Sequence, residues 1–517
     1  MNFIVLTISD LTHSKVDSVS PKINWARVDE ADNFAETVKL YRQGKYDEAS
    51  FRRFRLQHGA YGTRMTSDYA MVRVKLPAGE IYPKQFEKLS KLSEQYSIGS
   101  AHFSTRENIQ LHWVILEDVS EIFRSLAEVG LTSREACGNS VRNVMCSPLS
   151  GVCSDEKFDS TPYALATAKF FLRNPMAQSL PRKFKFNFTC CEKHGMVRMV
   201  DVGLIPEIRQ VDGSDQKGFK IFLGGGLGNK SFVGHQLEDF TPEEDLLYTS
   251  IAVMRIFDRL GDRKNLARNR MRYLVNDMGW EKFQNLVLKE RAIVRATQSV
   301  VTRLKVDTTP DKITRPLKIS DETGGSAPDG YARWLKTNTV KQKQSDYRSV
   351  FITLEAGDIT SNQLSALADV IRDFSSEGKA RTGFVQNVAL RYVHEDDLIP
   401  LYSKLLQSGL AKSGALTMTT PVGCSGTTSC NLALTNSHRL AKEIQRKFLE
   451  LKLDEDDDLT DSSIKISGCP NSCGQHGIAT IGFFGGGGRN GKDMYANYQM
   501  SLGGRFDGET MLGQTCL

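Results

Sequence analysis

The stretch that decides the fold runs from Tyr69 to Val114 and reads YAMVRVKLPAGEIYPKQFEKLSKLSEQYSIGSAHFSTRENIQLHWV. It begins with apolar residues that alternate with charged ones from Val72 to Leu76, which is the period of a half-buried strand. After Gly79, where a turn is expected, apolar residues recur at helical spacing from Phe86 to Tyr96. A second alternating run, Ile109 to Trp113, closes the stretch, so the sequence predicts a small β-α-β unit.

A second stretch, from Arg348 to Val393, repeats this order of elements and reads RSVFITLEAGDITSNQLSALADVIRDFSSEGKARTGFVQNVALRYV. Its Gly357 stands at the corresponding turn, and Asn387 before its last strand matches Asn108 in the first stretch. Any two β-α-β units share a general likeness. The matched glycine, the phase of the helix and the shared asparagine favour a true internal duplication.

A shorter repeat follows each of these units. CEKHG, Cys191 to Gly195, has the same skeleton as CGQHG, Cys473 to Gly477, and each comes after an alternating, strand-like run. We therefore predict an α+β (mixed α/β) fold of pseudo-twofold, duplicated architecture, in which each of two small β-α-β units is followed by a larger α/β unit. The predicted boundaries are an N-terminal arm at 1–65, small units at 66–125 and 346–412, larger units at 126–300 and 413–517, and a polar linker at 301–345.

Composition sets the broad class of protein. The 517 residues carry 67 Lys and Arg against 61 Asp and Glu, a net charge of +6, which is mild for this length and does not suggest a histone-like protein. No apolar run reaches the length of a membrane span. Phe3 to Ile8 is interpreted as an early strand and not as a signal peptide, so a cytoplasmic protein is expected. In that reducing compartment the ten cysteines are expected to be thiols or metal ligands.

Four of the cysteines form two tight pairs. Cys424 and Cys430 have five residues between them, and Cys469 and Cys473 have three, in the string SGCPNSCGQHG. Both pairs adjoin glycine, which lets the backbone approach a bulky ligand. Four thiolates can hold one [4Fe–4S] cluster. Zinc is the alternative, although a spacing of five fits it poorly, and four unrelated buried thiols are a third possibility.

The string Cys-x5-Cys followed by Cys-x3-Cys resembles the signature of the sirohaem-dependent sulfite and nitrite reductases, and GCPNSCGQHG is close to the wording of that family. The two-copy architecture is similar as well, and the resemblance covers the chain from about residue 45. It implies that the small units are ferredoxin-like half-domains and that the larger units bind sirohaem and substrate. It also implies that the four cysteines bind a [4Fe–4S] cubane and that Cys473 bridges it to the sirohaem iron as the axial ligand.

The other six cysteines are expected to be structural: Cys137, Cys146, Cys153, Cys190, Cys191 and Cys516. Cys190 and Cys191 are adjacent, and because neighbouring strand residues point to opposite faces, they are predicted to be poor joint ligands.

The resemblance also implies roles for basic residues, because sirohaem carries many carboxylates and the substrates are oxyanions. The residues expected around the substrate anion are Arg73, Arg142, Lys183 and Lys185. Those expected to bind the cofactor, besides Cys473, are Arg106, Gln110, His112, Arg182, Arg268 and Arg270. Glu107 replaces the family's usual Gln. For any one of these cations, a solvated surface charge is the ordinary alternative.

The predicted activity is that of an assimilatory sirohaem reductase, which reduces sulfite to sulfide with six electrons. Nitrite reduction to ammonia is the alternative, although nitrite-specific members typically carry Asn at the place of Lys185. Because no flavin or nicotinamide motif is found, a partner protein must supply electrons, and ferredoxin is favoured over a flavoprotein subunit. A zinc-bearing nucleic-acid-binding protein and a simple iron–sulfur carrier are more distant alternatives.

Overall fold

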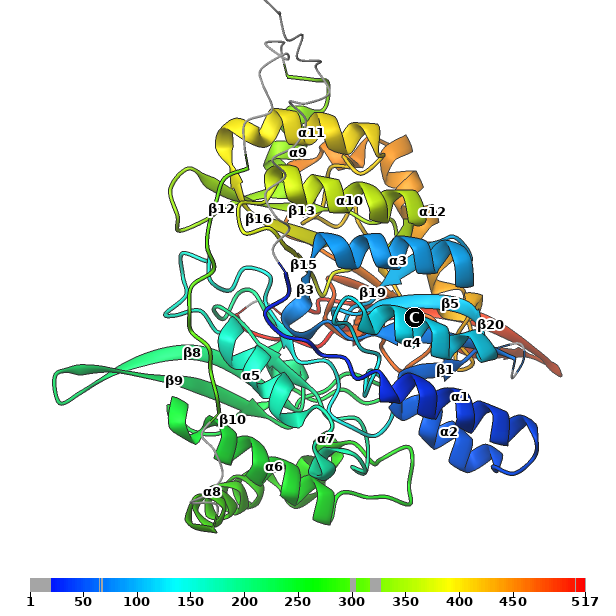
Figure 1. Ribbon diagram of the computed structural model, residues 1–517, viewed down its shortest axis with the longest axis vertical. Helices are drawn as coiled ribbons and strands as arrows, with labels where there is room; N and C mark the ends of the chain where they lie inside the picture. Colours follow the sequence, from blue (N-terminus) through cyan, green and yellow to red (C-terminus); the bar gives the residue numbers. More distant parts are fainter. Residues whose placement is uncertain are drawn as a thin grey trace, which may run out of the picture.

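The computed structural model describes residues 20–64, 66, 68–297, 304–316, 327–506 and 508–516. Within these residues the chain forms four sheets with helices packed on their outer faces (Figure 1). The predicted α+β fold with duplicated units is confirmed. The strand predicted at residues 3–8 lies outside the described residues.

The two small units have the same elements in the same order. The first contains β2 (Tyr69–Val74), α3 (Pro83–Tyr96), β4 (Ser100–Phe103) and β5 (Ile109–Ile115). The second contains β13 (Tyr347–Ile352), α10 (Ser361–Phe374), β15 (Ala380–Thr382) and β16 (Val388–His394). In both sheets the first strand pairs antiparallel with the last, as the alternating apolar runs predict.

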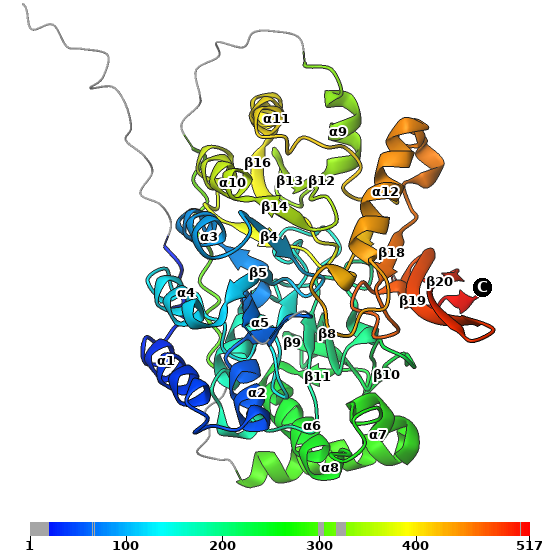
Figure 2. The ribbon, with the colours of Figure 1, turned by 90° about the vertical axis from the view of Figure 1, so that its right-hand side faces the viewer.

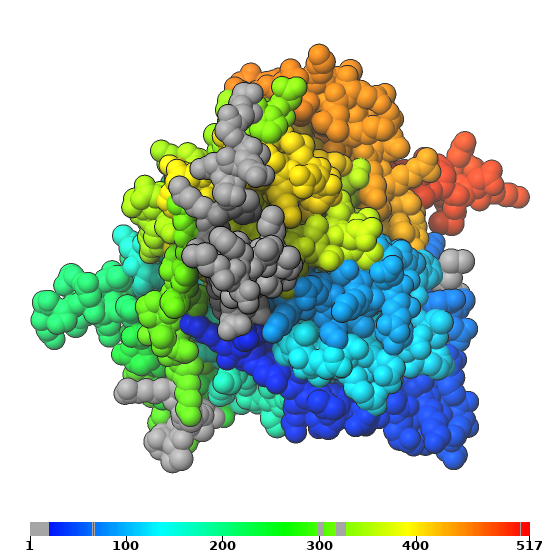
Figure 3. Space-filling model, turned by 45° about the horizontal axis from the view of Figure 1, so that its top comes forward, coloured from blue at the N-terminus to red at the C-terminus, as the bar shows by residue number. Residues whose placement is uncertain are grey.

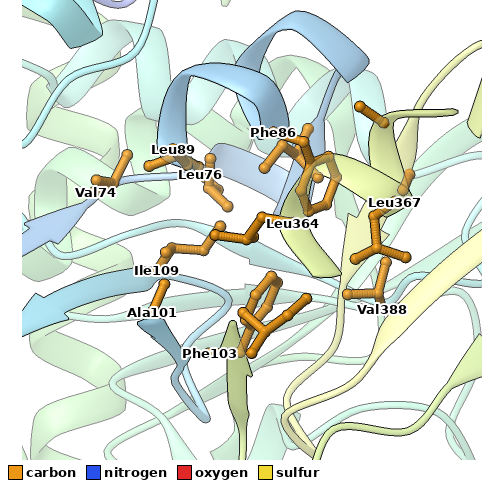
Figure 4. Packing of buried hydrophobic residues seen from close by; sticks show 14 of the residues in the cluster. Val74, Leu76, Phe86, Leu89, Ala101, Phe103, Ile109, Leu364, Leu367 and Val388 are labelled. Atoms are coloured by element: carbon orange, nitrogen blue, oxygen red, sulfur yellow. The ribbon is translucent and has the colours of Figure 1, made fainter. Parts of the chain in front are cut away.

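The small units exchange strands and share one core. The short strand β3 (Glu80–Ile81) of the first unit pairs with β15 of the second, and β14 (Asp358–Thr360) of the second pairs with β4 of the first. Helices α3 and α10 lie side by side, and Phe86 and Leu364, one from each helix, lie close together in a shared cluster of buried side chains (Figures 2 and 4). Neither unit therefore has a core that is independent of the other.

The duplication extends to unusual backbone conformations. Glu107 and Gln386, at matching positions before the last strand, both have positive φ, at 54° and 62°. Trp113 and Tyr392, within the last strands, have φ of 61° and 52°. Non-glycine residues seldom adopt this conformation, so its recurrence at matched positions supports descent of both units from one fold.

The two larger units also correspond to each other. The first sheet contains β6 (Met145–Cys146), β7 (Phe186–Phe188), β8 (Val202–Val211), β9 (Ser214–Leu223), β10 (His235–Gln236) and β11 (Thr241–Pro242). The second contains β17 (Val422–Gly423), β18 (Ile464–Ser467), β19 (Ile481–Asn490), β20 (Asp493–Leu502) and β21 (Gln514–Thr515). In each, three parallel strands lead into a long antiparallel hairpin, and the two hairpins, β8–β9 and β19–β20, project on opposite sides of the molecule (Figure 3).

Two glycines show which residues of the two larger units correspond to each other. A Cβ on Gly203 in β8 would lie 1.9 Å from the carbonyl oxygen of Val197, and one on Gly482 in β19 would lie 2.2 Å from that of His476. Both positions therefore exclude a side chain for the same reason. Gly203 pairs with Asn187, and Gly482 with Lys465, so each residue of β7 has a defined counterpart in β18.

Helices complete both larger units and cover the small ones. The larger units contain α5 (Thr161–Phe171), α6 (Leu246–Leu260), α7 (Met271–Met278) and α8 (Trp280–Thr297) in the first and α12 (Ser437–Glu450) in the second. Helices α4 (Val119–Ala127) and α11 (Leu398–Gln407) follow the small units. None of the described helices combines the length and apolar character that crossing a membrane requires.

Two segments are more structured than the sequence predicts. The expected N-terminal arm contains α1 (Asp29–Arg42), α2 (Glu48–Gln57) and β1 (Ala60–Gly62), and β1 pairs with β2 of the first small unit. The expected linker contains α9 (Tyr331–Asn338) and β12 (Thr339–Lys341), and β12 pairs with β13. Both additions extend the edges of the small sheets, which local periodicity alone does not reveal.

Candidate active site

The four paired cysteines lie in two loops at the same edge of one sheet. Cys424 and Cys430 follow β17, and Cys469 and Cys473 follow β18. Because β17 and β18 are parallel neighbours, their carboxyl ends lie side by side, and the two loops meet there. The structure therefore joins two pairs that are about forty residues apart in the chain.

Glycine allows these loops to touch through their backbones. A Cβ on Gly468 would lie 2.9 Å from the Cα of Gly426 and 2.9 Å from the carbonyl oxygen of Thr435. Since both atoms belong to the backbone, a side chain at this position could be accepted only if the loops moved apart. The glycines beside the cysteines thus let the two loops pack closely together.

Three of the four sulfurs have hydrogen-bond donors. The N–H of Gly468 donates to Cys424 Sγ at 3.2 Å, and the N–H of Leu432 donates to Cys430 Sγ at 3.4 Å. The Asn471 amide donates to Cys469 Sγ at 3.4 Å. Such donors stabilise thiolates and are among the groups that set the potential of an iron–sulfur cluster.

The spacing of these sulfurs does not fit a single ion. Within the described part of the chain, two groups of at least three His, Cys, Asp or Glu side chains have all ligand atoms within 4.8 Å of one another, and these four cysteines form neither group. A tetrahedral zinc ion would hold its sulfurs about 3.8 Å apart. The thiols are nevertheless close enough to interact, because Cys473 adds to the effect of burial in raising the pKa of Cys424, Cys430 and Cys469. The arrangement fits a larger centre such as a cubane.

A group of cations lies next to these loops. Arg73 on β2 and Arg142 before β6 both donate to the carbonyl oxygen of Ala136, at 3.4 and 3.1 Å. Arg106, between β4 and β5, donates to the carbonyl oxygen of Asn143 at 2.7 Å. Arginines from the first small unit and the first larger unit thus converge.

Lys183 and Lys185, just before β7, belong to the same group. Burial lowers the pKa of Lys183 to about 7, with Arg270 as the next cause. Burial and then Arg270 and Arg106 lower the pKa of Lys185 well below its usual value. The Asp201 carboxylate accepts from Arg270 at 3.1 Å and from the backbone N–H of Lys185 at 3.0 Å, and so links these two residues.

The cations and the cysteines adjoin. The Thr105 hydroxyl donates to the carbonyl oxygen of Cys473 at 2.8 Å, next to Arg106 in the sequence. The Cys473 thiol is exposed, unlike Cys469, and its charge opposes the fall in the pKa of Lys183. One face of the molecule therefore combines the four-cysteine loops with buried positive charge.

Several buried donors of this group have no protein acceptor. They are Arg73 Nε, Arg106 Nη1, Arg270 Nε and Arg272 Nη1. An unpaired donor on a buried cation is costly, so such atoms indicate the place of an anionic ligand. This arrangement fits a polycarboxylate macrocycle together with a small oxyanion.

Of the remaining predicted residues, three are buried or half-buried near the group of cations and one is exposed. Gln110 is buried opposite Arg73 across the β2–β5 pair, and Arg182 is half-buried beside Arg270. His112 is half-buried, but both of its ring nitrogens are buried and lack a partner, and burial lowers its pKa to about 3. Arg268 is not part of the group, because it is exposed and pairs with Asp277 at 2.7 Å.

Sequence reasoning missed three contributors. Arg272, two residues beyond Arg270, supplies one of the unpaired donors, and Asp201 is the carboxylate that positions Arg270. Gly226, in the loop GGGLGN, packs against both arginines, since a Cβ there would lie 3.2 Å from Arg272 Cδ and 3.4 Å from Arg270 Nη2. The alternation of arginines in RNRMR could have indicated Arg272, whereas nothing local identifies Asp201.

Comparison with known proteins gives matching family models over much of the chain. The model described as "Nitrite and sulphite reductase 4Fe-4S domain" matches residues 137–294, and that described as "Nitrite/Sulfite reductase ferredoxin-like half domain" matches residues 62–129 and 340–408. The chain belongs to the nitrite and sulfite reductase family. It is an oxidoreductase of that family, whose cofactors are a [4Fe–4S] cluster and sirohaem, as predicted. The alternative of a zinc-bearing nucleic-acid-binding protein is wrong.

Similar members of the nitrite and sulfite reductase family carry both activities in their names. The assimilatory ferredoxin-dependent nitrite reductase of Haloferax mediterranei is 30% identical over 431 residues, which are 81% of this chain and 70% of the relative. Sulfite reductase [ferredoxin] 1 of Mycolicibacterium paratuberculosis is 27% identical over 459 residues, 87% of this chain and 76% of the relative. The solved structure of the Mycobacterium tuberculosis NirA protein, 22% identical, has the same fold, with a TM-score of 0.76 over 94% of this chain and 89% of that one.

Proposed function

We propose that this chain is an assimilatory, ferredoxin-dependent sulfite reductase that reduces sulfite to sulfide with six electrons. The observation that carries the choice of substrate is Lys185, which lies with Lys183 beside the buried Arg270 and the half-buried Arg106 and Arg142. Sulfite is doubly charged and nitrite singly charged, and a dianion raises the pKa of a neighbouring lysine more than a monoanion does. Lys185 therefore takes up its proton more readily beside sulfite and favours that substrate. Nitrite reduction to ammonia is the second candidate, supported by the name of the Haloferax relative.

The cofactors have natural ligands in this arrangement. When bound, the cluster and sirohaem supply one-electron transfer and an iron with an open coordination position. Cys424, Cys430, Cys469 and Cys473 would hold the cluster, and the exposed Cys473 would also face the sirohaem. The carboxylates of the macrocycle would be held by Arg106, Arg182, Arg270 and Arg272, with Gln110 and His112 at the edge of the group.

The protein's own part in the reaction is to bind the anion and to move protons. Arg73, Arg142, Lys183 and Lys185 would surround the oxyanion with donors that are in place before it binds. Each oxygen that leaves as water needs protons. A lysine whose pKa is about 7 can release a proton at neutral pH and regain one, so Lys183 is the proposed proton donor.

Electrons would come from ferredoxin, with a flavoprotein subunit as the alternative. Ferredoxins are acidic, and the net charge of +6 on this chain favours their approach. The names of the relatives in Haloferax and Mycolicibacterium include ferredoxin. We place the reaction in the cytoplasm, where thiols stay reduced.

A comparison of kcat/KM for sulfite and nitrite, with reduced ferredoxin as donor and with sulfide and ammonia measured as products, tests the proposal. We expect a higher value for sulfite, and a clear preference for nitrite would overturn the assignment. Lys185→Asn should shift the ratio toward nitrite about tenfold, because asparagine cannot take up a proton beside the dianion. Lys282→Asn, an exposed lysine on α8, is the control and should leave the ratio unchanged.

A further inference from the structure

Four side chains of the first larger unit converge away from the cations. They are Cys153, which follows β6, and Cys190, Cys191 and His194, which follow β7. All of their ligand atoms lie within 4.8 Å of one another. The three cysteines are buried and the histidine is half-buried.

The distances are those of a tetrahedron around one ion. Cys191 Sγ lies 3.9 Å from Cys153 Sγ and 4.0 Å from Cys190 Sγ. His194 Nδ1 lies 3.6 Å from the sulfurs of Cys153 and Cys190 and 3.2 Å from that of Cys191. Zinc, with bonds of about 2.3 Å to sulfur and about 2.0–2.1 Å to nitrogen, sets its ligands about 3.8 Å apart for two sulfurs and about 3.5 Å for sulfur and nitrogen.

The prediction that Cys190 and Cys191 are poor joint ligands is therefore wrong. It assumed that the strand continues through both residues, but β7 ends at Phe188. Beyond that point the backbone bends, and the alternation of faces that holds in a strand no longer applies. The two sulfurs can then point to the same place.

The first of the two loops corresponds to a loop of the four-cysteine site. Cys146 pairs with Phe188 as Gly423 pairs with Ile466, so Cys146 and Gly423 are equivalent. Seven residues further on, Cys153 and Cys430 occupy the same place. The N–H of each donates to the carbonyl oxygen four residues earlier, at 3.0 Å in both.

The second loop corresponds as well. Cys191 comes three residues after Phe188, as Cys469 comes three residues after Ile466. Gly195 lies eight residues before Gly203, and Gly474 lies eight residues before its counterpart Gly482. The equal spacing places His194 at the position of Cys473. The match of CEKHG to CGQHG that the sequence suggests is thus shifted, by four residues at its cysteine and by three at its last glycine. The position of the remaining cysteine, Cys424, is occupied by Ser147 in the first unit. The Ser147 Oγ lies 3.6 Å from the sulfur of Cys190.

We propose that Cys153, Cys190, Cys191 and His194 bind one zinc ion, in a site that is the counterpart, in the first larger unit, of the four-cysteine site of the second. Only the comparison with the cluster rests on the proposed function; the coordination rests on the four side chains. Four protein ligands leave no open position, so the ion is structural and not catalytic.

The neighbourhood of the site indicates what the ion would stabilise. The loop that carries Cys153 binds the second small unit, where Lys343 N–H donates to the carbonyl oxygen of Val152 at 2.9 Å and Gln344 donates to that of Gly151 at 3.0 Å. Cys153, Cys190 and Cys191 pack against Phe351 and Ala389 of that unit's sheet. Zinc would therefore fasten the first larger unit to the second small unit.

Metal analysis and zinc K-edge X-ray absorption of the holoenzyme test the site directly. We expect about one zinc besides about five irons per chain. The absorption should fit about three sulfurs at about 2.3 Å and about one nitrogen at about 2.0–2.1 Å. Absence of zinc, iron in its place, or a disulfide joining two of Cys153, Cys190 and Cys191 in peptide mass spectra would overturn the proposal.

Matched variants separate this site from the cluster. Cys191→Ser and His194→Ala should lower zinc at least about fivefold while iron stays near five, whereas Cys469→Ser should lower iron and keep zinc. Cys516→Ser, at an exposed cysteine, should change neither metal. If Cys191→Ser keeps its zinc and Cys469→Ser loses it, the zinc belongs to the four-cysteine site and the proposal is wrong. Should Cys191→Ser fail to fold, the absorption spectrum of the unmodified enzyme still decides.

Discussion

The two larger units place sulfur ligands at equivalent strand ends but space them differently. In the second unit the four cysteines are too far apart for one ion, whereas in the first unit Cys153, Cys190, Cys191 and His194 lie within 4.8 Å. One difference in sequence accompanies this difference in spacing. The first unit has Cys190 where the second has Gly468, whose missing side chain lets the two loops meet through their backbones. The same scaffold can thus be fitted to a cluster or to a single ion.

The units differ in charge as well. Lys183 and Lys185 in the first unit correspond to Asp461 and Ser463 in the second. The N–H of Lys185 donates to the Asp201 carboxylate at 3.0 Å. In the second unit Thr480 takes the place of Asp201, and its hydroxyl accepts from the N–H of Ser463 at 3.1 Å. After duplication, therefore, the first unit contributes the cations and the second contributes the four-cysteine loops.

The largest expected effect, and the greatest difference between the two larger units, concerns the activity of variants that lack one of the equivalent thiols Cys469 and Cys191. We expect Cys469→Ser to lower sulfite reduction about a thousandfold, because it takes a ligand from the cluster that passes electrons. Cys191→Ser should keep activity within about threefold at low temperature, because a structural ion takes no part in the chemistry. Steady-state rates of both purified variants check this, and equal losses would contradict the division between the units.

Insertion of a side chain at Gly468, where the first unit carries Cys190, should disturb the four-cysteine site. Gly468→Ala places a Cβ 2.9 Å from two backbone atoms, so the loops must separate and the four thiols spread. We expect iron content and activity to fall at least about tenfold. The control is Gly487→Ala on β19, where a Cβ meets nothing within 4 Å. Full iron content in Gly468→Ala would show that the close contact is not required.

Replacement of Asp201 by its counterpart in the second unit should separate two roles. Asp201→Thr keeps an acceptor for the N–H of Lys185 but leaves Arg270 without its carboxylate. We expect kcat/KM for sulfite to fall about tenfold, or about 1.4 kcal/mol, because Arg270 is no longer held in place. Asp277→Thr breaks the exposed pair with Arg268 and should change kcat/KM less than about twofold. Similar losses in both variants would indicate a general effect on the fold.

The smallest expected effect concerns Lys465, whose counterpart in the first unit is the neutral Asn187. Burial lowers the pKa of Lys465 to about 7, from an ordinary value of 10.5. Between these two values the unfolded chain binds one more proton than the folded chain, so the free energy of unfolding should rise with pH, by at most about 1.4 kcal/mol per pH unit.

Lys465→Asn should remove the part of the pH dependence that Lys465 causes, while Lys183 and Lys185, whose pKa values are also lowered, keep theirs. Melting temperatures at pH 7, 8 and 9 for the wild-type enzyme and the variant check the slope, whatever the variant does to stability at a single pH. Parallel curves for the two proteins would mean that Lys465 stays charged in the folded chain, despite its 1% exposure.

Much of the fold could be predicted because strands and helices leave periodic patterns. The alternation from Val72 to Leu76 marks β2, and the spacing from Phe86 to Tyr96 marks α3. The exchange of β3 and β14 between the small sheets could not be predicted, since those strands have two and three residues and carry no pattern. The residues of the candidate site, too, could be predicted only in part. Motifs located Arg106 and Lys185, but they also suggested Arg268, which the fold turns toward solvent.

Periodicity and spacing are local properties of the chain, so the amino-acid order alone predicts the two small β-α-β units, the duplication and the pairs Cys424–Cys430 and Cys469–Cys473. The fold was needed to show that Asp201 holds Arg270 and that four ligands of the first larger unit meet, namely Cys153, Cys190, Cys191 and His194. The physical reason is that strand register and the residue at which a strand ends set which loops face each other. Both depend on packing between segments that are far apart in the sequence.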